Sequence, residues 1–374
     1  MINTNNDITI YDIMVIYSAY NPNNATSKED LGKFPFSSEG DGIYNDSYAY
    51  FLLKCKEMGL TAAFATSEDI IGPGLFQNFW TYDTKWIKNQ GKAYAEVFFD
   101  KFTPNTIEQE SQLQLLTSSE SIYMFNNRKL TALFQNKLDT FNYFTEFAIP
   151  TVEIADPSEQ EMLVAKTTLD KLLDKHRHGA DFTEGYIIKD ITGAGGFNIH
   201  KVAFDTLGFK EIVKNHTLGE KDKEGLSYIL QPFINCDNGF AFEEHNWPID
   251  IRVIILWTKI IQTYIRIAEE GKFECNIHQG GRLFYISQET MPPEVLDMSK
   301  KIVEILDTKI NLKHSLYALD FMQSNDGNVY FIEGNDTPGI IWEHKNTMDE
   351  AKSKELIDII IGELVLISKE KQVG

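Results

Sequence analysis

The sequence predicts a protein of the α/β and α+β class, in which a small parallel α/β domain precedes a larger part built from helices and antiparallel sheets. Two observations indicate this class. Near the N-terminus, a strand-like segment, a helical pattern and a second strand-like segment follow one another, and this order favours a parallel sheet. Beyond residue 126, strand-like segments come in pairs joined by short turns, which is typical of antiparallel hairpins.

The N-terminal domain is expected over residues 1–125. Its helix is predicted to start after an N-cap at Asp46 and to end at Gly59, because glycine readily adopts the left-handed conformation of a C-cap. The loop over residues 21–45 has no regular pattern and is expected to help shape a substrate pocket. The predicted strands are Ile13–Tyr17, Thr61–Ala65 and Ala93–Phe99.

The larger part is expected to divide into subdomains over residues 126–230 and 231–374. One helix is predicted over residues 128–148, because Pro150 ends the helical pattern. Ser158 and Glu161 match a capping box that opens a second helix. The remaining predicted elements are a hairpin of Gly185–Lys189 with Phe197–Val202, a hairpin of Ile251–Leu256 with Lys259–Ala268, helices over residues 292–306 and 348–369, and a mobile insertion over residues 235–247.

Composition excludes several classes of partner and site. Lys and Arg number 35 against 55 Asp and Glu, and the net charge of −20 repels nucleic acid and anionic membranes, so neither is expected as a partner. Cys55, Cys236 and Cys275 show no CxxC spacing, which argues against a disulfide framework and a zinc site. The N-terminus lacks a signal-peptide pattern and no run of 18 apolar residues occurs, so a cytoplasmic protein is expected.

A predicted hairpin of Leu316–Gln323 with Val329–Asn335 carries oxygen ligands on an otherwise apolar face. Side chains alternate along a strand, so an even-numbered loop, either residues 325–326 or 325–328, brings Asp320, Glu333 and Asn335 to one side. The four-residue loop sets Asp320 opposite Glu333, with the two carboxylates roughly 5 Å apart. Burying two bare carboxylates is unfavourable unless a cation lies between them, and such oxygen donors suit magnesium. The alternative is an exposed hairpin whose acids face water.

Two further segments have residues suited to phosphate. The glycine-rich turn Thr192–Gly196 follows a strand that ends in Lys189, and such a turn lets backbone N–H groups approach phosphate oxygens. Asp250 and Arg252 share one strand face beside Arg266 of the next strand, and guanidinium groups bind phosphate by paired hydrogen bonds. Taken singly, each segment is explained more simply without a ligand: the first as a glycine-rich hairpin turn and the second as a cross-strand salt-bridge ladder on a solvated face.

The order of these segments over roughly residues 126–343 resembles the ATP-grasp superfamily, in particular its glutathione synthetase and ribosomal-protein glutamate ligase (RimK-like) branch. The first resembling motifs are Asn136-Lys137 before Ile149-Pro150-Thr151, Tyr186 to Lys189, and the glycine turn. The segment Tyr228 to Ile234 resembles the one whose backbone reads adenine, although Pro232 stands where relatives commonly have Glu. The resemblance implies ATP contacts by Lys137, Lys189, Gly193, Gly195, Gly196, Gln231, Phe233, Ile234 and Asp250.

The later motifs carry the implied chemistry. Asp250 to Arg252 with Arg266, and Asn276 to Gly281, resemble family segments near the reacting groups, although Gln279 stands where Arg is common. The hairpin carboxylates, followed by Thr337-Pro338-Gly339, resemble the family's magnesium triad. The resemblance implies Arg252, Arg266 and Asn276 as catalytic residues, and Asp320, Glu333 and Asn335 as ligands of one or two Mg²⁺ ions, with Mn²⁺ as a substitute.

The resemblance implies an ATP-dependent carboxylate–amine ligase that forms an amide through an acyl phosphate and releases ADP and phosphate. Its substrates would be small-molecule or peptide carboxylates and amines, and similar enzymes are commonly homodimers or homotetramers. Two alternatives stay open. One is an ATP-grasp phosphotransferase acting on a hydroxyl, and the other is an inactive ATP-binding scaffold, at which Pro232 and Gln279 hint.

Overall fold

The computed structural model describes residues 8–19, 33–36, 42–104, 106–156, 158–182, 185–192, 199–202, 227–344 and 346–373. The chain forms two compact units. Unit 1 comprises Met1–Asn127, His314–Leu316 and Thr337–Gly374, and unit 2 comprises Arg128–Lys313 and Tyr317–Asp336. Residues 337–374 thus pack with the N-terminal part, whereas the expected subdomain over residues 231–374 would place them in the second part. A bond from the Tyr50 hydroxyl to Asp358, 2.9 Å long, is one of the contacts that hold the last helix there.

Unit 1 is built on a mixed sheet with the strand order β1-β6-β5-β3-β2-β7-β8 and with β4 beside β5. Strand β2 runs parallel to β3 and β7, and β7 runs parallel to β8, which confirms a parallel sheet in this part. The antiparallel hairpin of β5 and β6 was not predicted. The strands are β1 (Ile8–Ile10), β2 (Ile13–Tyr17), β3 (Ala62–Thr66), β4 (Ile70–Gly72), β5 (Leu75–Tyr82), β6 (Trp86–Tyr94), β7 (Val97–Lys101) and β8 (Tyr123–Phe125).

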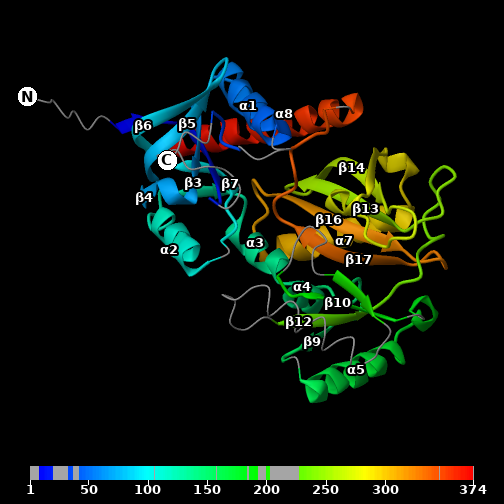
Figure 1. The fold of residues 1–374 in the computed structure, drawn as a ribbon. Coiled ribbons are helices and arrows are strands. Elements are labelled where there is room, and N and C mark those ends of the chain that lie inside the picture. Colours follow the sequence, from blue (N-terminus) through cyan, green and yellow to red (C-terminus); the bar gives the residue numbers. More distant parts are fainter. Residues whose placement is uncertain are drawn as a thin grey trace, which may run out of the picture. The chain divides into compact units, whose positions relative to one another are not determined.

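Helices cover both faces of this sheet. Met14 and Ile16 of β2 share a core with Leu116 of α2 (Ile107–Leu116). On the opposite face, Phe51 of α1 (Gly42–Glu57) stacks on Phe99 of β7 with ring centroids 4.8 Å apart. Figure 1 shows α1 beside α8 (Thr347–Val373) on one side of the sheet and α2 on the other. Successive side chains of a strand point to opposite faces of the sheet, so a strand that is apolar on both faces needs helices on both sides, as in an α/β layer arrangement.

Two boundaries in unit 1 differ from the prediction. The predicted strand Ala93–Phe99 is the end of β6 and the start of β7, and the chain turns between Tyr94 and Val97. Helix α1 begins at Gly42, ahead of the predicted N-cap at Asp46. The predicted end of this helix is confirmed, because Gly59 adopts a left-handed φ of 82°.

Unit 2 contains two antiparallel sheets, which confirms the predicted α+β organisation. Sheet C has the order β11-β10-β12-β9 and sheet B has the order β15-β14-β13-β16-β17. Both predicted hairpins are confirmed, as β10 with β11 and as β13 with β14. The strands are β9 (Val152–Ile154), β10 (Tyr186–Asp190), β11 (Ile199–Val202), β12 (Tyr228–Pro232), β13 (Ile249–Leu256), β14 (Lys259–Ile267), β15 (Arg282–Tyr285), β16 (Leu316–Gln323) and β17 (Val329–Asn335).

Each sheet of unit 2 has one helix-covered face. In sheet C, Ile188 and Leu230 pack on Leu169 of α5 (Glu159–Leu173). Ser158 is the N-cap of α5, because its hydroxyl accepts a 3.2 Å bond from the Glu161 N–H, which is one of the two bonds of the predicted capping box. In sheet B, Ile251 shares a core with Ile302 of α7 (Pro293–Lys309). Side chains alternate along a strand, so Lys189, which follows Ile188 in β10, lies on the face of sheet C that α5 does not cover. In the same way, Asp250, which precedes Ile251 in β13, lies on the face of sheet B that α7 does not cover.

The helix predicted over residues 128–148 is two short helices, α3 (Arg128–Gln135) and α4 (Lys137–Tyr143). Asn136 separates them, because its side-chain oxygen accepts hydrogen bonds from the N–H groups of Leu138 and Asp139, each 3.0 Å long. This N-cap restarts the helix and puts Lys137 at its first position. The predicted insertion over residues 235–247 is tied to the β16–β17 turn, since the Asn325 N–H donates to the Asn235 carbonyl at 2.8 Å.

Candidate functional site

The β16–β17 hairpin pairs Asp320 with Glu333, as predicted. The predicted even-numbered loop is wrong. Gln323 pairs with Val329 and the Ser324 N–H bonds the Asn328 carbonyl, so three residues form the turn and Gly327 takes a left-handed φ of 85°. A β-bulge between Asp320 and Phe321 adds one residue on β17. The extra residue cancels the effect of the odd-numbered turn, so Asp320 and Glu333 still lie on the same face of the hairpin.

Asp320 is not a bare carboxylate. It is 1% exposed, and both of its oxygens accept hydrogen bonds from the Nε and Nη2 of Arg252. The Nη2 of Arg266 donates to the same carboxylate at 2.9 Å. Burial raises the pKa of Asp320, but the two guanidinium groups outweigh burial and hold that pKa below its usual value. The premise that only a metal could explain this buried acid is therefore wrong, because arginines from sheet B already neutralise it.

The same network includes the predicted pair on β13 and β14. Asp250 lies directly opposite Arg266, which confirms that an acid and two guanidinium groups converge across the sheet. Arg266 donates to Asp250 through its Nε at 2.9 Å and also through Nη2. Arg252 uses Nη1 for the Tyr264 hydroxyl at 3.3 Å, and both arginines are at most 7% exposed. A solvated salt-bridge ladder is therefore excluded, because the whole network is buried.

Two lysines, Lys137 and Lys189, interact electrostatically with Glu333 of β17. Lys189 lies in β10, and burial lowers its pKa to about 8, with nearby Glu333 opposing that change and Lys137 reinforcing it. Burial also lowers the pKa of Lys137, while Glu333 and Asp190 oppose the change. Burial thus disfavours the charged form of both ammonium groups, and an anionic ligand would relieve that cost.

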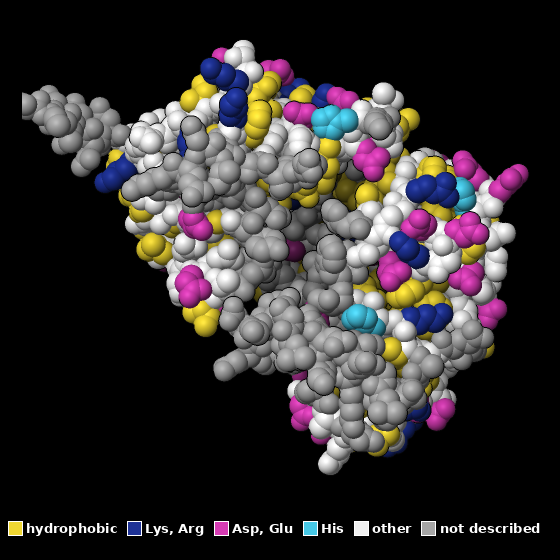
Figure 2. Space-filling model, viewed as in Figure 1, with side chains coloured by type: hydrophobic (Ala, Val, Ile, Leu, Met, Phe, Trp, Pro, Cys, Tyr) yellow, Lys and Arg dark blue, Asp and Glu magenta, His cyan; other side chains and the backbone are white. Residues whose placement is uncertain are grey.

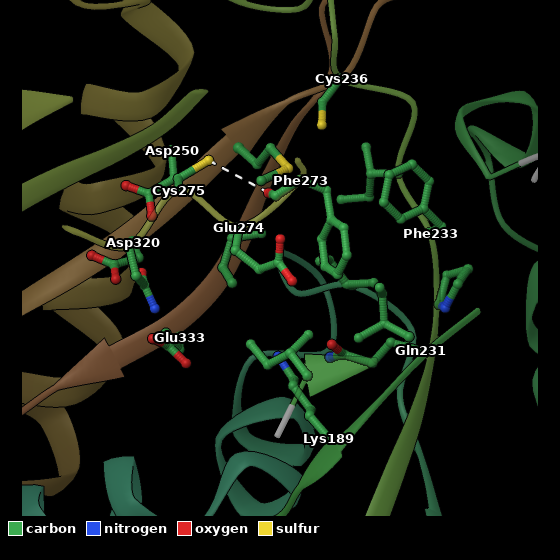
Figure 3. Close-up of a pocket in the computed structure, with 18 residues that line it drawn as sticks. Lys189, Gln231, Phe233, Cys236, Asp250, Phe273, Glu274, Cys275, Asp320 and Glu333 are labelled. Atoms are coloured by element: carbon green, nitrogen blue, oxygen red, sulfur yellow. Dashed lines mark hydrogen bonds between the residues drawn. The ribbon is translucent and has the colours of Figure 1, made fainter. Parts of the chain in front are cut away.

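A cavity that is open to solvent lies between sheets B and C of unit 2. Figure 3 shows Phe233 and Gln231 on one side of it, Asp320 and Glu333 on the other, and Lys189 below. One end is apolar, and the other holds the charged groups described above. The lining residues are Ile149, Ile187, Lys189, Ile199, Gln231, Pro232, Phe233, Ile234, Cys236, Asp250, Phe273, Glu274, Cys275, Asn276, Asp320, Met322, Ile332 and Glu333.

The apolar end contains the three residues predicted to contact a base. The Phe233 N–H donates to the Gly185 carbonyl at 3.0 Å, so that group is not available to a ligand. The buried Ile234 has no hydrogen-bond partner for its N–H in the described part of the chain. Gln231 donates through Nε2 to the Thr151 hydroxyl at 2.7 Å, and Thr151 in turn donates to the Ile149 carbonyl. This chain fixes the amide orientation of Gln231 and, among the residues that the structure describes, leaves its Oε1 able to accept a hydrogen bond.

The remaining predicted residues fall into two groups. Asn276 lines the cavity, and Asn335 lies on β17 two residues beyond Glu333. The predicted phosphate glycines Gly193, Gly195 and Gly196 lie outside the described residues. Glu274 lines the cavity but was not predicted, because it belongs to a non-repeating segment before β15. The alternation of Glu274 with Asn276 in an extended segment is the signal that could have identified it.

The oxygen donors at the charged end fit a magnesium ion. Among the described residues, no three Asp, Glu, His or Cys side chains form a metal-binding group, so the predicted set depends on the amide oxygen of Asn335. Glu333 has no hydrogen bond or ion pair to any described side chain, and Asp320 keeps further lone pairs beside its arginine bonds. Two carboxylates and an amide are hard donors of the kind that magnesium prefers.

On the face viewed in Figure 2, acidic side chains are scattered and Lys and Arg do not gather into a patch. None of the helices in the described ranges has the length and apolar character needed to cross a bilayer.

Comparisons with solved structures find the same fold in several proteins. D-alanyl-alanine synthetase A from Vibrio cholerae O1 biovar eltor has 12% identity and a TM-score of 0.58, covering 96% of this chain and 99% of its own. D-alanine–D-alanine ligase from Bacillus anthracis, complexed with ATP, has 13% identity and a TM-score of 0.55 with the coverages 96% and 99%. The ATP-grasp ligase PsnB, complexed with a phosphomimetic variant of its minimal precursor, Mg and ADP, has 10% identity and a TM-score of 0.52 with the coverages 94% and 98%.

Sequence comparisons give the family. No curated protein sequence matches the chain. Among protein-family models, the one described as YheC/D like ATP-grasp matches residues 134–361, which include both sheets of unit 2 and every described residue of the cavity. The chain therefore belongs to the YheC/D-like ATP-grasp family.

Proposed function

We propose that this protein is an ATP-dependent carboxylate–amine ligase. The observation that carries the proposal is the polarity of the unit 2 cavity, which has an apolar end at Phe233 and Ile234 and a charged end at Lys189 and Glu333. A nucleoside triphosphate has the same polarity, with a flat base at one end and anionic phosphates at the other. Membership of the ATP-grasp family and the ligase names of several proteins of this fold support the same reaction class.

The base is proposed to lie at the apolar end. The Ile234 N–H and the Oε1 of Gln231 supply one donor and one acceptor for its edge, and the Gln231 amide is held in that orientation by Thr151. Pro232 contributes no N–H, and the N–H of Phe233 is already bonded to Gly185, so Phe233 contributes its ring and carbonyl. This assignment keeps Gln231, Phe233 and Ile234 as nucleotide contacts and gives each a distinct role.

The phosphates are proposed to lie between Lys137 and Lys189. Both ammonium groups lose solvation on burial, so an anionic ligand interacts with them strongly and raises their pKa values. We also propose Gly193, Gly195 and Gly196 as backbone contacts to the phosphates. The phosphate groups would then replace water around the two ammonium groups, which the fold already holds in position.

Arg252 and Arg266 are proposed to act differently. Arg252 uses Nε, Nη1 and Nη2 within the network, so it positions Asp320 instead of binding substrate. Arg266 uses Nε and Nη2 for Asp250 and Asp320, and within the described ranges its Nη1 remains as the donor that can stabilise the transferring phosphate. Asp250 then serves to orient Arg266, and Asn276 is proposed as a further polar contact near the reacting groups.

Asp320, Glu333 and Asn335 would hold one or two Mg²⁺ ions, or Mn²⁺ in their place. When bound, the metal would neutralise phosphate charge as the terminal phosphate leaves ATP. The substrate carboxylate would take that phosphate to give an acyl phosphate, and an amine would then displace it to form an amide, with ADP and phosphate released. We propose small-molecule or peptide acids and amines as substrates, and the glutathione synthetase and ribosomal-protein glutamate ligase branch as the nearest chemistry.

A mass-spectrometric screen tests the proposal. The protein is incubated with ATP, magnesium and pools of acids and amines, and products are sought that are lighter than the sum of one acid and one amine by one water. ADP and phosphate must appear in step with that product. A stable phosphorylated hydroxyl compound without an amide would select a phosphotransferase, and ATP binding with no product in any mixture would select an inactive scaffold.

Two variants make this screen specific. Glu333→Gln removes the carboxylate charge with little change of shape and should abolish turnover. Glu270→Gln changes an exposed acid of the same unit and serves as the matched control, so it should leave turnover unchanged. Full activity of Glu333→Gln would remove the metal site from the proposal.

A further inference from the structure

Asp181 is a buried carboxylate that holds two residues of the β16–β17 hairpin. It lies in a helical turn after α5 and is 2% exposed. Its Oδ2 accepts hydrogen bonds from the Tyr330 hydroxyl and, at 3.0 Å, from the Nδ2 of Asn328. Its carbonyl accepts from the Asn235 N–H at 3.0 Å, and the Asn235 carbonyl in turn accepts from the Asn325 N–H. A residue outside sheet B thus fixes the end of the hairpin at which β17 begins.

Two backbone arrangements of this hairpin would set Asp320 opposite Glu333. In the observed one, a three-residue turn is followed by the β-bulge, so Tyr330 pairs with Met322 and the extra residue of β17 is Ile332. In the other, a four-residue turn would need no bulge. The two arrangements give the hairpin carboxylates the same place and differ in the residues between the turn and Glu333.

The arrangements also differ in which side chains reach the cavity. In the observed one, Ile332 lines the cavity, while Phe331 is buried in the core on the opposite face, 5.4 Å from Phe144 between ring centroids. Side chains of a strand without a bulge alternate strictly, so Phe331 would point into the cavity and Ile332 into the core. Because Ile332 packs on the cluster that contains Ile234, the phenylalanine ring would fill the apolar end of the cavity.

Asp181 stabilises only the arrangement with the bulge. There Tyr330 packs on Phe182, with ring centroids 5.2 Å apart, and its hydroxyl reaches the carboxylate. With a four-residue turn, Tyr330 would point into the core instead. A phenol without a partner in an apolar core, and a buried carboxylate with one donor fewer, are both unfavourable. The bonds of Asp181 therefore act as a selector between the two arrangements.

We infer that Asp181 is a positioning residue that selects the bulged arrangement of β17 and thereby keeps the apolar end of the cavity open to its ligand. Asp181 is not one of the residues that line the cavity, so it acts through Tyr330 and Asn328. That the ligand is ATP rests on the proposed function, whereas the arrangement of β17 does not depend on it.

Alkylation of an introduced thiol reports the arrangement directly. Ile332→Cys places a thiol on the cavity wall. The native thiols react slowly with iodoacetamide, because each is at most 5% exposed and burial raises its pKa; they belong to Cys55, Cys236 and Cys275. Adding Asp181→Leu, which removes the acceptor, should slow alkylation at position 332 by about threefold or more, because the thiol turns into the core. Adding Asp181→Asn, whose amide oxygen can still accept, should keep most of the parent rate.

ATP affinity, measured by calorimetry in the chain with Ile332 intact, tests the consequence for the ligand. It should fall about 10-fold in Asp181→Leu and stay within about threefold of the wild type in Asp181→Asn. The matched control is Tyr317→Phe, which removes a buried hydroxyl of the same hairpin that donates to the Trp257 carbonyl at 3.0 Å. This control should leave both the alkylation rate and the ATP affinity within about twofold.

The outcomes separate this inference from the proposed function. Alkylation at position 332 that is as fast or faster with Asp181→Leu overturns the selector role, because the thiol then stays on the cavity wall or the hairpin has only loosened. Slower alkylation with unchanged ATP affinity overturns the claim that the bulge keeps the cavity open. A loss of affinity that Tyr317→Phe shares also overturns it, since lower stability then explains the loss. Absence of ATP binding by the wild-type protein overturns the proposed function, and the alkylation rates still decide the role of Asp181.

Discussion

Replacing Lys189 by Met should stabilise the protein without ligand while removing nucleotide binding. Lys189 is 5% exposed, and burial lowers its pKa from 10.5 to about 8. At pH 7 the folded protein therefore holds a charge that the surroundings do not fully compensate, and the pKa difference corresponds to about 3 kcal/mol. Methionine fills a similar volume without a charge, so Lys189→Met should raise the free energy of unfolding by up to about 3 kcal/mol at this pH.

The pH dependence of this gain has a definite sign. Between pH 8 and pH 10.5, the lysine is neutral in the folded protein and still protonated in the unfolded chain. The unfolded chain then binds more protons, so the wild-type protein becomes more stable as the pH rises and the cost of burial fades. The advantage of Lys189→Met should be fully present below pH 8 and should shrink to about 1 kcal/mol near pH 9.5.

Urea denaturation at pH 7 and pH 9.5, without nucleotide, measures both effects. Lys259→Met removes an exposed lysine of the same unit and should change the free energy of unfolding by less than about 0.5 kcal/mol. If Lys189→Met is no more stable than the wild type at pH 7, or if its advantage is the same at both pH values, the reasoning about the buried ammonium group is refuted.

Three further predictions follow from the same network and its surroundings. Arg266→Met leaves Asp250 and Asp320 buried with one guanidinium group fewer, so it should cost about 3–5 kcal/mol in urea denaturation, and a loss below about 1 kcal/mol would contradict the network described here. Gly334→Ala puts a Cβ atom 2.3 Å from the Phe134 ring and should destabilise by about 1–3 kcal/mol; with Phe134→Leu the two changes should cost less than their sum, and strict additivity would argue against this contact. ATP affinity, followed by calorimetry across pH, should fall as the pH rises through about 8 because Lys189 loses its proton, and an affinity that stays constant to pH 9.5 would exclude Lys189 as a phosphate contact.

The pairing of Asp320 with Glu333 was predictable because strand alternation leaves few registers that put both acids on one face. The turn and the bulge that produce this pairing could not be predicted. Gly327 forms a three-residue turn instead of an even loop, and the bulge after Asp320 compensates for it. Each is a local choice of backbone conformation that the alternation of side chains does not encode, and the two deviations cancel.

The surroundings of Asp320 could not be predicted from its own hairpin. Its neutralising partner Arg252 lies 68 residues earlier, and their contact depends on β13 lying next to β16 in sheet B. The helix break at Asn136 was missed because the residues on both sides keep a helical pattern, while the side-chain cap interrupts it locally. Glu274 was missed because it lies in a segment without regular secondary structure, where only its two-residue spacing from Asn276 pointed to the cavity.

The central claim, that unit 2 holds ATP and magnesium between Lys189 and Glu333, is tested most directly by titration calorimetry of ATP with and without magnesium. The wild-type protein should bind one ATP per chain, more tightly with magnesium present. Lys189→Met should lose ATP binding in both conditions, whereas Glu333→Gln should lose only the effect of magnesium. ATP binding that is unchanged in both variants, or no binding by the wild-type protein, would contradict the account.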